Sequence, residues 1–344
     1  MPPSNQDLEA SLSKTLDNIL SSHSAPSIAL AIAFPTGSHI IAKGTLKHGS
    51  QTPITPSSLY MLGPLTSTFI PLILSRLIAQ NLFTWNSKIT SLLPNIQIHH
   101  EHQETTLEML ARHITGITTK LPEIDHGALA SELMNLSGYK GRHKLVTTVL
   151  VAPPDEKPGT DGYRNAINLL ILAFIAETAT KKSWEELLKL YIFDIVPMPS
   201  AGLGRPGPEA KFEGCPFPHT SPKMVLGEGI TTPWLDCKAT YPALGVSADL
   251  GDVISYLRFC VEEERRDGAK YELAPGGKFV KAGFDVLVRE GKGDVLQCKG
   301  HVSGFATGVL VAGDVAWAVF VNLDGVEGAE VRDEVGRVVM DMFV

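Results

Sequence analysis

The sequence lacks three features that mark common classes of protein. It has no dense basic run, and 30 Lys and Arg against 37 Asp and Glu give a formal net charge of −7. Nucleic-acid binders concentrate Lys and Arg on one face, so we expect no nucleic-acid partner. No uninterrupted apolar segment is long enough to span a bilayer, and the stretch MPPSNQDLEASLSKTLDNILSSH does not resemble a secretory signal. We therefore expect no membrane partner.

Cysteine is also scarce. The four cysteines are far apart and form no Cys-x-x-Cys pair, which argues against a zinc knuckle or a redox motif. They are interpreted as buried free thiols in a reduced, cytoplasmic protein. They are Cys215, Cys237, Cys260 and Cys298.

The apolar pattern changes twice along the chain. A first helix is followed by two strand-like runs, 27–34 and 39–47, joined by a turn-rich link that predicts a β-hairpin. From about 58 to 265 the period is helical, apart from a Pro- and Gly-rich segment at 195–245 that is too long for a simple connector. Four short β-rich runs between 284 and 325 then predict an antiparallel meander, and a helix ends the chain.

This order predicts an α/β (α+β) fold in which the hairpin and the meander join into one antiparallel sheet. The sheet domain would comprise residues 1–57 and 270–344, with terminal helices flanking the sheet. Residues 58–269 would form a mainly helical insertion, and a cleft would lie at the seam between the two parts.

Four stretches in this order resemble the superfamily of serine β-lactamases and penicillin-binding proteins, in particular its class C-like esterase branch. SSLYMLGPLTSTFIPLILSRLIAQNLF resembles the family's nucleophile helix, and TTLEMLARHITGI the helix and loop that usually end in His-Thr-Ser-Gly. KPGTDGYRNAINLLILAFIAE matches a Pro-Gly and Tyr-x-Asn pattern, and KGHVSGFATGVLVAG the strand with Lys-Thr-Gly or His-x-Gly. The resemblance covers nearly the whole chain.

The family's Ser-x-x-Lys motif is degenerate in this sequence. The stretch LGPLTSTF places Pro64 at the serine position and Ser67 at the lysine position. Proline has no nucleophile, and a weak hydroxyl needs an adjacent base before it can attack. Because proline suits the first turn of a helix, we expect the fold to survive and the acyl-enzyme chemistry to be absent. Ser67 itself is the candidate for a substitute nucleophile.

The resemblance assigns roles to further residues. Tyr163 and Asn165 preserve Tyr-x-Asn, which implies a proton donor and a substrate-orienting amide; the alternative for Tyr163 is a buried helix cap. His301 is aligned with the basic residue of the strand motif, either as a pocket residue or as strand-end packing. Ser303 would narrow the cleft or be an ordinary strand-edge serine. Glu228 and Trp234 lie in the irregular region that would roof the cleft.

The His-rich stretch IHHEHQE at 98–104 raises the question of a metal. Its histidines lack the i, i+4 spacing on a helix that a zinc site favours, so we interpret it as a solvated loop. We expect no metal and no cofactor.

Three functions remain open for a small-molecule cleft of this kind. The first is a rewired, non-hydrolytic enzyme for cyclisation, isomerisation or elimination, possible in natural-product biosynthesis, with Tyr163 and His301 as acid–base groups. The second is a hydrolase or acyl transferase that uses Ser67. The third is a binding protein without catalysis. The sequence does not define an oligomeric state.

Overall fold

The computed structural model describes residues 5–118, 128–160, 165–204, 214–225, 237–265, 280–281, 284–287, 295–302 and 304–344. Its strands are β1 (Ser27–Phe34), β2 (Gly37–Gly44), β3 (Tyr60–Met61), β4 (Gly202–Leu203), β5 (His219–Ser221), β6 (Met224–Val225), β7 (Val246–Ala248), β8 (Val280–Lys281), β9 (Phe284–Leu287), β10 (Val295–Val302), β11 (Phe305–Ala312) and β12 (Val315–Val321).

The α-helices are α1 (Asn5–His23), α2 (Phe69–Ala79), α3 (Ile89–Leu92), α4 (Leu107–Ala111), α6 (Ala128–Met134), α7 (Gly138–Leu150), α8 (Ala166–Thr180), α9 (Trp184–Leu188), α11 (Tyr241–Leu244), α12 (Leu250–Arg265) and α13 (Gly325–Phe343). The described residues also form three short 3-10 helices, η1 (Gly63–Thr68), η2 (His100–His102) and η4 (Lys238–Thr240), and a π-helical turn, η3 (Lys189–Phe193).

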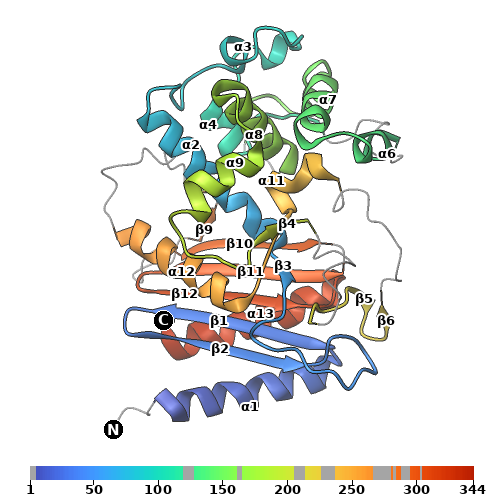
Figure 1. Ribbon diagram of the computed structural model, residues 1–344, viewed down its shortest axis with the longest axis vertical. Coiled ribbons are helices and arrows are strands. Elements are labelled where there is room, and N and C mark those ends of the chain that lie inside the picture. Colours follow the sequence, from blue (N-terminus) through green and yellow to red (C-terminus); the bar gives the residue numbers. More distant parts are fainter. Residues whose placement is uncertain are drawn as a thin grey trace.

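The hairpin and the meander form one antiparallel sheet, as the sequence predicted. The strand order is β2-β1-β12-β11-β10-β9-β8, so the N-terminal hairpin pairs with the last strand of the chain. Figure 1 shows this sheet in the lower half of the molecule, with the helical region at its other end. The predicted α/β architecture is confirmed.

The two faces of the sheet bury side chains of different size, and the sequence SIALAIAF explains why. Successive residues of a strand point to opposite faces. Ile28, Leu30 and Ile32 therefore pack in the core shared with α1 and α13. The intervening alanines, Ala29, Ala31 and Ala33, belong to the larger core that continues into the helical region. Their small side chains let α12 lie against β1 and β12, although α12 falls within the predicted helical insertion.

The helical region is centred on α8, whose apolar residues are buried around most of the helix. Next to it, α9 begins with a capping box: the Ser183 hydroxyl accepts from the Glu186 backbone, and the Glu186 carboxylate accepts from the Ser183 backbone. All four cysteines are buried and free, which confirms that prediction. Within the described ranges, no helix combines the length and the apolar composition needed to cross a bilayer.

Candidate functional site

The segment that resembles a nucleophile helix begins with a 3-10 turn. After the short strand β3, η1 runs over Gly63–Thr68 and continues directly into α2. Pro71 contributes to this geometry because it has no N–H to donate to the carbonyl of Ser67, as an α-helix would require. Pro64 lies in the first turn of η1, where its missing donor is tolerated.

The seam between the helical region and the sheet is closed tightly where η1 meets β10. A Cβ atom at Gly300 would lie only 2.4 Å from Cγ of Pro64, so the proline ring rests directly on the strand backbone. Gly63, which precedes Pro64 in η1, also lies close to β10: a Cβ atom at this position would be 2.8 Å from Cγ1 of Val302. Gly63 also has a φ of 54°, which favours glycine. These two glycines let η1 and β10 approach each other at the position where the family carries its nucleophile.

Ser67 is nearly inaccessible at this contact. The residue is 2% exposed, and its hydroxyl donates a hydrogen bond of 2.6 Å to the carbonyl of Pro64. Nucleophilic attack requires that a base take up the hydroxyl proton and that a substrate reach the oxygen. The bond to a backbone carbonyl and the burial both work against such a role. The assignment of Ser67 as a substitute nucleophile stays a prediction that this geometry disfavours.

Cys298 faces Pro64 from the strand, and sequence reasoning missed it. Its thiol donates to the Pro64 carbonyl at 3.2 Å, and the residue is 1% exposed. Cys298, Lys299 and Gly300 have the spacing of the family's Lys-Thr-Gly or His-x-Gly motif, with a thiol in place of the basic residue. The sequence signal for this alignment is Gly300: the motif ends in a glycine two residues after its basic residue, which selects Cys298. The structure shows why a glycine is needed there, since a Cβ at position 300 would meet the Pro64 ring.

His301 lies on the opposite face of the sheet from Pro64. It is an odd number of residues from Cys298, and alternate residues of a strand point to opposite sides. Its Nδ1 is 3.2 Å from the carboxylate of Asp324, at the start of α13. The ring lines a groove of about 1110 Å³ between β10 and α13, together with Lys299 and Arg337. The structure therefore does not bring His301 to Ser67, contrary to the arrangement that the resemblance implied.

Asn165 is the N-cap of α8. Its Oδ1 accepts from the backbone of Ile167 at 2.8 Å, and its Nδ2 donates to the carbonyl of Ile117 at 2.9 Å. Both polar groups of the amide thus bind backbone and join α8 to the loop after α4. The substrate-orienting role stays a prediction. The other predicted site residues, Tyr163, Ser303, Glu228 and Trp234, lie outside the described residues.

Two buried tyrosines flank η1. Burial raises the pKa of Tyr60 and of Tyr256 well above the ordinary value, so both phenols are neutral near pH 7. The hydroxyl of Tyr256 shares a 2.5 Å hydrogen bond with the hydroxyl of Thr68, the last residue of η1. Neither neutral phenol is suited to act as a base near pH 7.

A cluster of potential metal ligands lies in another part of the molecule. Among the described residues, His99, His100 and Glu101 offer ligand atoms that all lie within 4.8 Å of one another. They belong to the segment around η2, between α3 and α4, and not to the seam.

Comparison with known proteins agrees with the fold. A penicillin-binding protein homologue from Pyrococcus abyssi, described as octameric, superposes with a TM-score of 0.75 at 15% identity, covering 97% of this chain and 77% of that one. A beta-lactamase/D-alanine carboxypeptidase from Pseudomonas syringae gives 0.75 at 13% identity, covering 98% and 99%. SurE with D-Leu gives 0.74 at 13% identity, covering 98% and 76%. At such low identity these similarities show the fold alone.

No curated protein matches this sequence. The family model described as Beta-lactamase matches residues 12–339, which include most of both terminal helices, the sheet and the helical region. This chain therefore belongs to the beta-lactamase family.

Proposed function

We propose that this protein is a small-molecule enzyme of the beta-lactamase fold that works without an acyl-enzyme intermediate. The reaction would be a cyclisation, isomerisation or elimination, in which the site acts by shape and proton transfer. The observation that carries the proposal is the contact between Pro64 and Gly300, which fills the nucleophile position with a ring that cannot attack. In this proposal Tyr163 is the proton donor, and the substrate is a small molecule.

The surroundings of Pro64 support the loss of hydrolytic chemistry. Two groups that face this position, the Ser67 hydroxyl and the Cys298 thiol, both donate to the Pro64 carbonyl. A cytoplasmic location is part of the proposal, because four buried free thiols suit a reducing compartment.

Absence of acyl-enzyme chemistry is tested with a fluorophosphonate probe and with a chromogenic cephalosporin. We expect no adduct on the wild-type chain and no hydrolysis above that of Ser67→Ala, while a serine β-lactamase treated in parallel reacts with both. Peptide mass spectrometry that locates an adduct on Ser67, lost in Ser67→Ala, would contradict the proposal and favour a hydrolase or acyl transferase.

A second candidate is a ligand-binding protein without catalysis, favoured by the position of His301 on the far face of the sheet. The two candidates differ in what happens to a bound molecule. Ligands are first found by the rise they cause in melting temperature, and each is then analysed by mass spectrometry after incubation. Conversion by the wild type but not by Tyr163→Phe supports the enzyme. A ligand recovered unchanged supports the binding protein.

A further inference from the structure

The segment 98–104 is more ordered than the solvated loop that its sequence suggested. The backbone N–H of His99 donates to the carbonyl of Leu150 at 2.7 Å, which ties the segment to the end of α7. The N–H of His102 donates to the carbonyl of His99 at 2.9 Å and forms the turn of η2. The neighbouring helix α3 lies at the end of the helical region farther from the sheet (Figure 1). The turn is therefore a fixed structure remote from β10.

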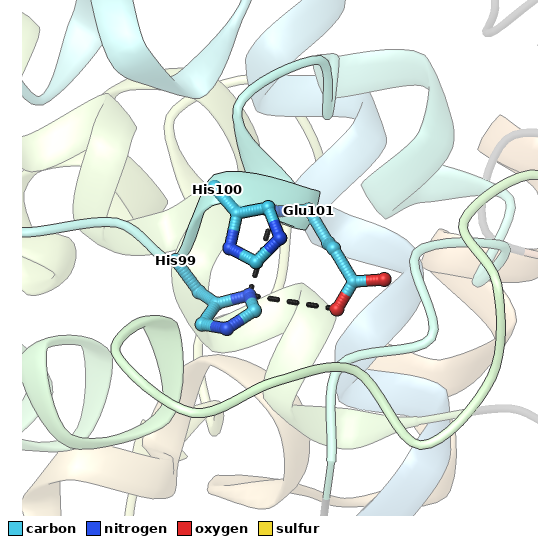
Figure 2. A group of neighbouring side chains, drawn as sticks. All are labelled: His99, His100 and Glu101. Atoms are coloured by element: carbon cyan, nitrogen blue, oxygen red, sulfur yellow. Dashed lines mark hydrogen bonds and ion pairs between the residues drawn. The ribbon is translucent and has the colours of Figure 1, made fainter.

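This turn brings three consecutive side chains together. His99 is extended, with φ −56° and ψ 143°, and the next residues are helical. The change in backbone conformation directs the side chains of His99, His100 and Glu101 toward one another, so the i, i+4 spacing of an α-helix is not needed. Figure 2 shows the two imidazole rings side by side, with the carboxylate extending toward His99. The ring centroids are 4.3 Å apart, and His99 Nδ1 is 3.7 Å from Glu101 Oε2.

The electrostatics of the group favour a bound cation. The backbone N–H of Glu101 makes a long hydrogen bond of 3.4 Å to His99 Nδ1, so the lone pair of this nitrogen is directed to this side, and a metal ion bound to Nδ1 would replace that hydrogen bond. The carboxylate oxygens of Glu101 are acceptors as well when ionised. Two acceptors thus face each other across a short gap, and a cation placed between them would be attracted by both.

The dimensions suit a transition metal better than a larger cation. Zn²⁺ binds imidazole nitrogen and carboxylate oxygen at about 2.0–2.2 Å in a tetrahedron, which puts ligand atoms roughly 3.4 Å apart. The His99–Glu101 separation is already close to this value. His100 is exposed, so its ring can complete the set by rotating about its side-chain bonds. The buried His102 ring packs edge-on against the His99 ring, with centroids 6.3 Å apart, and this contact helps to fix the position of the His99 ring.

We propose that His99, His100 and Glu101 bind one divalent transition-metal ion of the Zn²⁺ type, with water in the remaining coordination position. Two imidazoles and one carboxylate form a donor set that Zn²⁺, Ni²⁺ and Cu²⁺ accept, whereas Mg²⁺ and Ca²⁺ prefer oxygen ligands. The proposal concerns a site separate from the seam and does not depend on the function proposed there.

The test is equilibrium dialysis of the full chain against Zn²⁺, with the bound metal measured by mass spectrometry, and the visible absorption of a Co²⁺ complex as a second readout. We expect one Zn²⁺ per chain and a rise in melting temperature. His100→Ala and Glu101→Gln change exposed side chains, so they should fold normally and lose at least about tenfold in Zn²⁺ affinity.

Matched controls use the same residue types outside the group. Glu104→Gln alters an exposed acid that pairs with Lys88, and His143→Ala alters an exposed histidine on α7. Both should keep the wild-type affinity. The proposal is overturned if the wild type does not bind stoichiometric Zn²⁺. That result is expected if His99 and Glu101 form only an ion pair with each other. It is also overturned if His100→Ala and Glu101→Gln bind as tightly as the controls.

Discussion

The ion pair between Arg142 and Glu177 holds the helical region together from inside. Arg142 Nε donates to one carboxylate oxygen of Glu177 at 2.7 Å and Nη2 to the other at 2.5 Å, which joins α7 to α8. The guanidinium also donates to the carbonyl of Lys238 at 2.9 Å, and the carboxylate accepts from the backbone of Trp184 at 2.9 Å. Both side chains are fully buried. The pair therefore links four elements: α7, α8, α9 and η4.

Removal of one partner should be severe because the other charge remains buried. We expect Glu177→Gln and Arg142→Met each to lower the free energy of unfolding by about 3–5 kcal/mol. Typical proteins have about 5–15 kcal/mol in total, so this loss is a large fraction. The double variant leaves no unpaired charge, and it should cost less than the sum of the two single variants by about 1–3 kcal/mol.

The large expected loss of unfolding free energy arises from the burial of the ion pair and not from its short N–O distance. The exposed pair Lys88–Glu104 has an N–O distance of 2.7 Å, close to that of the buried pair, so Glu104→Gln is a matched control. It should cost no more than about 1 kcal/mol. Stability is measured by urea unfolding, followed by tryptophan fluorescence and by circular dichroism to test for a single transition. Equal losses for Glu177→Gln and Glu104→Gln, or simple additivity in the double variant, would refute the argument.

Three further predictions concern Gly300, Ser183 and His219. Gly300→Ala should lower the free energy of unfolding by about 1–3 kcal/mol, because its Cβ would meet the Pro64 ring, and Pro64→Ala in the same chain should restore part of the loss. Ser183→Ala removes the cap of α9 and should cost about 1 kcal/mol in urea unfolding. Burial lowers the pKa of His219, so the unfolded chain takes up the proton first as the pH falls below about 6.5. His219 therefore contributes stability above that pH which is lost on acidification, and His219→Gln should flatten the fall in melting temperature between pH 7 and 5.

Each of these has a control and a contradicting result. Gly336→Ala on α13 meets nothing nearer than 3.9 Å and should not destabilise, whereas a Gly300→Ala variant as stable as wild type would show that the seam yields freely. Ser183→Asn keeps a capping oxygen and should be close to wild type. His143→Gln, at an exposed position, should leave the pH dependence unchanged. An unaltered slope in His219→Gln would mean that the imidazole does not carry the effect.

Local patterns predicted most of the fold. The two strand-like runs of the hairpin and the β-rich runs of the meander depend on neighbours in sequence, and the structure contains both as parts of one sheet. The packing of α12 on β1 was not predictable in this way, because it depends on the small side chains of Ala29 and Ala31 in a distant strand.

The candidate site was harder to predict because it depends on which face of the sheet each residue of β10 points to. A shift of one residue moves a side chain to the other face of a sheet. Alignment on His301 chose the wrong face, while Gly300 and its contact with Pro64 select Cys298. The turn at His99 was also missed, because the spacing rule used for its histidines holds for α-helices and these residues form a 3-10 turn.

The close contact of η1 with β10 means that a serine at position 64 would not by itself restore a working nucleophile. A serine in place of Pro64 would supply a hydroxyl, but position 67 is almost completely enclosed. A lysine there would need its ammonium group paired in a nearly dry space, which costs several kcal/mol when no partner is ready. Position 298 would have to change as well, so each single step toward a working nucleophile would pass through a less stable protein.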